Sequence, residues 1–192
     1  MEALHLIGEV DMEAFRIVMV KVLKQLRNFR FQYLANSHRP ISELYLSELL
    51  SELNPVFLQE LDLMLDINEK HMEQIGRLVE LEELVVTIGA LSLVTDAWIN
   101  PFKRLKKLKT LNVRRHPNVT YSYEKSILLR EDWNRTTGAA MTTEGIANVL
   151  NALPNLENAK LMSVCNRREV TMEKVLALLS PSARVRLGLN IY

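Results

Sequence analysis

A short hydrophobic pattern, Leu-x-x-Leu-x-Leu, recurs along the chain and constrains its fold more than any other feature. Its second half alternates with period two, which is typical of a β-strand with one buried face. Copies of it begin at Leu26, Leu58, Leu81, Leu108 and Leu156, and residues 185–191 alternate in the same way. The central positions are Phe29, Leu61, Leu84, Leu111, Ala159 and Leu187, which are 32, 23, 27, 48 and 28 residues apart. Recurrence at this distance indicates stacked structural units.

The segments between the predicted strands carry apolar residues three and four positions apart, as amphipathic helices do. Most of these segments begin with Asn or Thr, whose side-chain oxygen accepts hydrogen bonds from the amides of a first helical turn. The start residues Asn68, Thr95, Thr143 and Thr171 each lie sixteen positions before the next central strand position. This constant offset predicts an α/β chain of about six helix–strand units.

The segment from Met141 to Leu161, MTTEGIANVLNALPNLENAKL, resembles a leucine-rich repeat of the ribonuclease-inhibitor-like or cysteine-containing type. Repeats of that type begin the helix with an I-T-D-x-G-L turn and enter the strand through L-P-N-L-x-x-L-x-L. The sequences Val94-Thr95-Asp96 and Val170-Thr171 are similar to that turn. The resemblance implies a single leucine-rich-repeat domain over residues 1–192, folded as an α/β solenoid with a parallel sheet on its concave side.

The spacing of 48 residues between two central positions marks an insertion at residues 115–141. An insertion in a repeat array usually projects from one face and often contributes to binding. This one carries Tyr121, Tyr123 and Trp133, and tyrosine and tryptophan are enriched at interface hot spots. Alternatively, Leu128, Leu129 and Trp133 pack onto the core as an irregular repeat.

Side chains that alternate with the strand leucines are expected on the opposite face of the sheet. They combine charged, amide and thioether groups. Such a mixture suits a protein-binding surface, and it equally suits any solvated sheet face. The candidate partner-binding residues on this face are Arg30, Gln32, Asp62, Met64, Thr87, Asn112, Arg114, Lys160 and Met162.

Charged residues are segregated along the chain, although the formal net charge is only +1. Residues 16–39 contain six basic and no acidic residues, and residues 43–83 contain eleven acidic residues against two basic ones. Residues 103–115 contain seven basic and no acidic residues. In a solenoid these segments become bands along its axis, which would steer a charged partner. The alternative is that the charges only keep helix faces soluble.

No catalytic, cofactor-binding or metal-binding pattern is evident in the sequence. The four histidines and the single Cys165 lack the spacing of metal ligands, and no glycine-rich phosphate loop is present. Neighbouring Glu82 and Glu83 would point to opposite sides of a strand, which does not suit an acid–base pair. The lone cysteine, the lack of a signal-peptide pattern and the lack of a long apolar stretch predict an intracellular protein, cytoplasmic or nuclear.

The sequence therefore predicts a non-catalytic module that binds another protein as the recognition subunit of an intracellular complex. It predicts no cofactor, no small-molecule substrate and no membrane association. The resemblance adds substrate recognition for a ubiquitin ligase, because F-box substrate receptors carry such repeats, although we find no F-box pattern before Leu26. The alternative is a structural subunit docked constitutively in a larger assembly. RNA binding has less support, since residues 103–115 contain no aromatic side chains for base stacking.

Overall fold

The chain is an α/β structure built on one parallel sheet. The computed structural model describes residues 3–7, 22–32, 43–64, 67–88, 94–115, 141–162, 164–165 and 170–191. Within these residues seven strands lie side by side in chain order. The strands are β1 (Ala3–Ile7), β2 (Asn28–Gln32), β3 (Glu60–Met64), β4 (Glu83–Ile88), β5 (Thr110–Arg115), β6 (Asn158–Met162) and β7 (Gly188–Ile191), and all six pairings are parallel.

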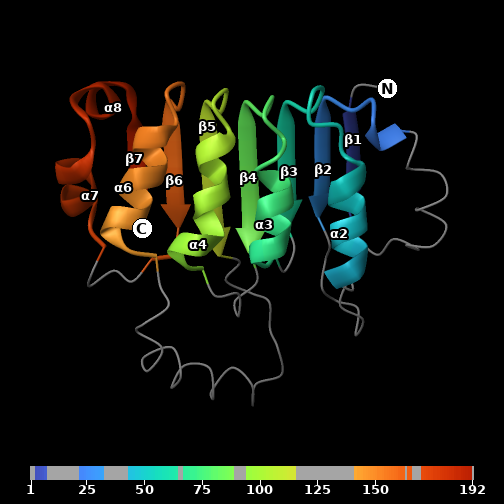
Figure 1. Cartoon of the computed structure of the whole chain (residues 1–192), viewed down its shortest axis with the longest axis horizontal. Coiled ribbons are helices and arrows are strands. Elements are labelled where there is room, and N and C mark those ends of the chain that lie inside the picture. Colours follow the sequence, from blue (N-terminus) through green and yellow to red (C-terminus); the bar gives the residue numbers. More distant parts are fainter. Residues whose placement is uncertain are drawn as a thin grey trace, which may run out of the picture.

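The described helices connect these strands, as parallel pairing requires. They are α2 (Glu43–Glu52), α3 (Glu69–Ile75), α4 (Asp96–Ile99), the 3-10 helix η1 (Asn100–Arg104), α6 (Thr143–Ala152), α7 (Met172–Leu178) and α8 (Pro181–Arg186). Figure 1 shows α2, α3, α4 and α6 in front of the strands, on the same face of the sheet. The core lies between this face and the helices.

The register of the inner strands follows the repeated hydrophobic pattern, and this prediction is confirmed for β2 to β6. The central positions pair from strand to strand in the order Phe29, Leu61, Leu84, Leu111 and Ala159. The first leucine of every copy is fully buried: Leu26, Leu58, Leu81, Leu108 and Leu156 are each 0% exposed. Because every copy buries the same positions, the strands stack without a change of register.

A recurring pair of backbone hydrogen bonds fixes where each strand begins relative to the preceding one. The Gln59 carbonyl accepts from the amides of Glu82 and Glu83 at 2.8 and 3.0 Å. The Glu82 carbonyl accepts in the same way from Lys109 and Thr110 at 2.8 and 3.0 Å. One backbone carbonyl thus accepts hydrogen bonds from two consecutive amides at the start of the next strand. This pairing satisfies backbone groups that would otherwise lack a partner.

The last strand departs from the predicted register. Leu189, rather than Leu187, pairs with Ala159. The expected offset of sixteen residues from Thr171 is therefore wrong, because the observed offset is eighteen (171 to 189). Helix α8 takes up the additional residues, and Val185, predicted in the strand, lies in this helix with 91% of its surface exposed. The helix begins at Pro181, whose fixed φ suits a first helical position.

Helix starts follow the predicted capping residues with one correction. Asn68, Thr95 and Thr171 cap α3, α4 and α7 as expected. Helix α6 is capped by Thr142 instead of Thr143, and the Thr142 hydroxyl accepts from the Gly145 amide at 2.9 Å. Asp96 holds Thr142 in this position. The Thr142 amide donates to Asp96 Oδ1 at 2.8 Å, and the Thr142 hydroxyl donates to Asp96 Oδ2 at 2.7 Å.

The contact between Asp96 and α6 leaves no space for a side chain at Gly145. A Cβ atom there would lie 2.0 Å from Oδ1 and 2.2 Å from Cγ of Asp96. These distances are far inside van der Waals contact, so an alanine would displace the carboxylate. Glycine is required here by this close approach and not by an unusual backbone conformation.

We expect Gly145→Ala to lower the free energy of unfolding by about 1–2 kcal/mol, because the displaced Asp96 carboxylate loses its hydrogen bonds to Thr142. In an Asp96→Ala background the same substitution is expected to raise it by about 0.5–1 kcal/mol, since alanine is the better helix former. Urea unfolding of the four chains measures both effects. An effect of the same sign in both backgrounds would contradict the described contact.

The predicted insertion at residues 115–141 is described only at its two ends. The candidate residues Tyr121, Tyr123 and Trp133 lie outside the described residues. Whether they take part in binding stays a prediction.

Candidate functional site

The face of the sheet that points away from α2, α3, α4 and α6 carries three rows of side chains, which we name the open face. Its first row is Asn28, Glu60, Glu83, Thr110 and Asn158. Its central row is His5, Arg30, Asp62, Val85, Asn112 and Lys160. Its third row is Gln32, Met64, Thr87, Arg114 and Met162. Adjacent strands are about 4.8 Å apart, so neighbours within a row can interact.

The structure thus brings together all the strand residues that the sequence proposed as partner-binding. Period two places them on one face, and the matched register aligns them across the sheet. Their exposure differs: Arg30, Lys160 and Met162 are exposed, whereas Gln32, Asp62, Met64, Asn112 and Arg114 are half-buried. The exposed side chains are the ones that a partner would meet first.

Arg30 and Asp62 form an ion pair between β2 and β3. The Nε atom of Arg30 lies 2.8 Å from Oδ2 of Asp62, and Gln32 Nε2 donates to the same oxygen at 3.5 Å. The Asp62 side chain is only 12% exposed, whereas that of Arg30 is 45% exposed. The other carboxylate oxygen, Asp62 Oδ1, is buried and has no hydrogen-bond partner among the described residues. Asp62 therefore orients Arg30 and keeps one acceptor unused.

Thr87 does not have the exposed position that the sequence suggested. It is 3% exposed, and its hydroxyl accepts from Arg114 Nε on the neighbouring strand at 2.8 Å. The alternation of Thr87 with the strand leucines predicted the correct face of the sheet, but it did not predict that Thr87 is buried. The buried Thr87 hydroxyl therefore orients Arg114.

Sequence reasoning missed the first row of the open face and His5, and the charged or titratable residues among these are His5, Glu60 and Glu83. His5 lies on β1, for which no copy of the repeated pattern was found, and it pairs in register with Arg30. Glu60 and Glu83 immediately precede central leucines, and the same period-two argument would have placed them on this face. Both glutamates are exposed and are partners in register.

Two hollows on the described surface are either small or shallow. One of about 20 Å³, on the open face, is lined by His5, Asn28, Phe29, Arg30, Glu60, Leu61, Asp62, Glu83 and Val85. That is space for about one water molecule and far below the 300–1,000 Å³ or so of a small-molecule site. A second hollow of about 550 Å³ lies between α6 and α7, and most of its lining side chains are exposed. Neither is an enclosed pocket for an organic ligand.

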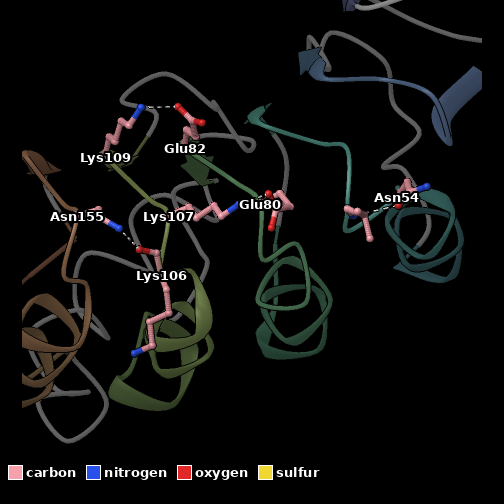
Figure 2. Close-up of polar contacts among 8 residues, drawn as sticks. Asn54, Glu80, Glu82, Lys106, Lys107, Lys109 and Asn155 are labelled. Carbon is pink, nitrogen blue, oxygen red and sulfur yellow. Dashed lines mark hydrogen bonds and ion pairs between the residues drawn. The ribbon is translucent and has the colours of Figure 1, made fainter.

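Ion pairs link residues that lie just before β4 and β5 in the chain (Figure 2). Lys109 Nζ lies 2.7 Å from Glu82 Oε2, and Lys107 pairs with Glu80. The hydrogen bond to Glu82 and the charge of that carboxylate raise the pKa of Lys109. The basic segment 103–115 and the acidic segment 43–83 therefore neutralise each other in part where these strands begin. Such exposed pairs are screened by solvent and add little to stability.

Reactive groups for chemistry are sparse in the described part of the chain. No group of three or more His, Cys, Asp and Glu side chains is placed there to hold a metal ion. Cys165 is buried, and burial, followed by the charge of Asp96, raises the pKa of its thiol to about 12. At neutral pH this thiol is protonated and is a poor nucleophile.

We expect Cys165 in the folded chain to react with a disulfide reagent at neutral pH about 10³-fold more slowly than in the unfolded chain, because both thiolate content and access are reduced. Release of thionitrobenzoate measures both rates, with the guanidinium-unfolded chain as the control. Equal rates in the two states would contradict the buried position of the thiol.

No protein-family model matches the chain, and no curated protein is significantly similar to it in sequence. Among the described helices, none is long and apolar enough to cross a bilayer. The function must therefore be inferred from the geometry of the chain itself.

Proposed function

We propose that the chain is a leucine-rich-repeat solenoid of stacked helix–strand units. The matched register of β2 to β6 supports this proposal. The hydrogen bonds from two consecutive amides to one carbonyl, which recur at the starts of successive strands, support it too. A single helix–strand unit cannot bury both of its apolar faces, whereas stacked units share one continuous core. In such a solenoid the open face lies on the concave side.

We further propose that the open face binds another protein and that the chain acts as a recognition subunit of an intracellular complex. One observation carries this proposal: Arg30, Lys160 and Met162 are exposed on the described sheet surface, where the hollow beside Arg30 holds only about 20 Å³. A surface without a pocket recognises macromolecules through side chains spread over its area. Substrate recognition within a ubiquitin ligase is a specific form of this role, supported by the resemblance of residues 141–161.

A constitutive docking subunit is the second candidate, and the composition of the open face argues against it. Permanent interfaces are large and apolar. Of the well-exposed large apolar side chains in the described residues, only Met162 belongs to the open face. RNA binding is also disfavoured, because the described open face carries Glu60, Asp62 and Glu83 and no Phe, Tyr or Trp for base stacking.

Charge reversal on the open face is expected to abolish partner capture. The variant Arg114→Glu/Lys160→Glu changes two cations on β5 and β6, whereas Lys70→Glu/Arg77→Glu makes the same net change on and beside α3. Affinity capture from lysate, quantified by mass spectrometry, is expected to show at least one protein retained by the wild type and the α3 variant but lost from the open-face variant. Identical retention by all three chains would refute binding through this face.

A further inference from the structure

Two glutamates face each other on β3 and β4 of the open face. Glu60 and Glu83 are partners in register, and both are exposed. Neither carboxylate has a hydrogen bond or an ion pair with a described residue, in contrast to Glu80 and Glu82 at the strand entrances. Like charges directly opposite each other in a sheet are unfavourable. A cation between these two carboxylates would relieve the repulsion.

The neighbouring carboxylate of Asp62 adds an unused acceptor to the same place. Its Oδ2 atom pairs with Arg30, whereas Oδ1 is buried without a partner in the described part of the chain. Glu60, Asp62 and Glu83 line one hollow together with His5 and Arg30. An ammonium or guanidinium group offers several donors, and it could bind both glutamates and approach the Asp62 oxygen.

Strands β5 and β6 present the opposite charge on the same face. Arg114 is oriented by Thr87, a neutral partner, and Lys160 is exposed without an ion pair to a described residue. The described open-face residues of these two strands include no carboxylate. The open face therefore has an acidic half on β3 and β4 and a basic half on β5 and β6.

The distance between the two halves fits an extended peptide that crosses the strands. Two strand spacings, about 10 Å, separate the middle of the β3–β4 pair from the middle of the β5–β6 pair. Lys160 and Arg114 also lie two and four residues farther along the strands than Glu60 and Glu83, so the two halves are about 14 Å apart along a diagonal. An extended chain covers this distance in about four residues. Asn112 lies in the central row of β5, the strand of the basic half next to the acidic half, and its buried Oδ1 atom also lacks a partner among the described residues. A backbone amide of a crossing segment could donate to it.

We propose that the partner presents an extended segment with a basic and an acidic side chain about four residues apart. The basic side chain binds over Glu60 and Glu83, and the acidic one binds over Arg114 and Lys160. This inference rests on the proposed function, because it specifies the chemistry of the partner of the same open face.

Selection from a random displayed peptide library on the immobilised full chain tests this inference. The wild type is expected to enrich sequences with Lys or Arg about four residues from Asp or Glu. The variant Glu60→Lys/Glu83→Lys is expected to bind a selected peptide at least about tenfold more weakly. A peptide whose basic residue is replaced by glutamate is expected to regain binding to that variant. The control Glu144→Lys/Glu173→Lys reverses two exposed glutamates on α6 and α7 and is expected to bind as the wild type does.

Two negative results are distinguishable. Peptides that are lost with Arg114→Glu/Lys160→Glu but are insensitive to reversal of Glu60 and Glu83 would overturn this inference and leave the open face as the binding surface. A selection that enriches no peptide sensitive to either pair would overturn the proposed function together with this inference.

Discussion

Replacing Trp98 by alanine is expected to lower the free energy of unfolding by about 3–5 kcal/mol. Trp98 lies on α4, is 0% exposed and packs edge-on against Phe102 with ring centroids 6.0 Å apart. Its indole Nε1 donates to the Ile67 carbonyl at 3.1 Å inside the core. The substitution therefore removes a large buried volume and leaves that carbonyl without its donor. Urea unfolding followed by circular dichroism measures the change.

The variant Trp98→Phe separates the two contributions. It keeps an aromatic ring beside Phe102 but cannot donate to Ile67, so we expect a smaller loss of about 1–3 kcal/mol. If both variants unfolded within about 0.5 kcal/mol of the wild type, Trp98 could not occupy the described position.

Replacing Leu84 by alanine is expected to cost about 2–5 kcal/mol, because it leaves a cavity in the middle of the sheet. Leu84 is the central position of β4, pairs with Leu61 and Leu111, and is 0% exposed. Val79→Ala is the matched control, since Val79 is also apolar but 44% exposed. The control is expected to change stability by less than about 0.5 kcal/mol. Equal effects of the two substitutions would contradict the register of β4.

The inner strands were predictable because each carries its own copy of one local pattern. Leu81, Leu84 and Val86 of β4 recur as Leu108, Leu111 and Val113 of β5, and all are buried at equivalent positions. Burial of one face with period two leaves a single register. This argument uses only the local sequence pattern, so the register of the inner strands could be predicted from the sequence alone.

The outer strands were harder to predict because the pattern weakens there. In β1, Leu4 and Leu6 alternate, but no leucine three positions earlier introduces them. At the other end, Pro181 could mark the end of one helix or the first position of the next, and it opens α8. Ser180 caps that next helix by accepting from the Ala183 amide at 3.3 Å.

The face of each candidate residue was predictable, but its contacts were not. Alternation assigned Thr87 and Asp62 to the open face correctly. The hydrogen bond from Arg114 to Thr87 joins residues 27 positions apart, and the use of only one Asp62 oxygen depends on side-chain geometry. In the same way, the charge segments were visible in the sequence, whereas the pairing of Lys109 with Glu82 required the register between adjacent strands.

Site-specific photo-crosslinking tests most directly whether the open face is the binding surface. A benzophenone side chain is placed at Met162 on β6 or at Leu178 on α7, which are 40% and 46% exposed in the unmodified chain. The protein retained by the wild type in affinity capture is expected to crosslink from position 162 and not from position 178. Crosslinking from position 178 alone would contradict binding through the open face.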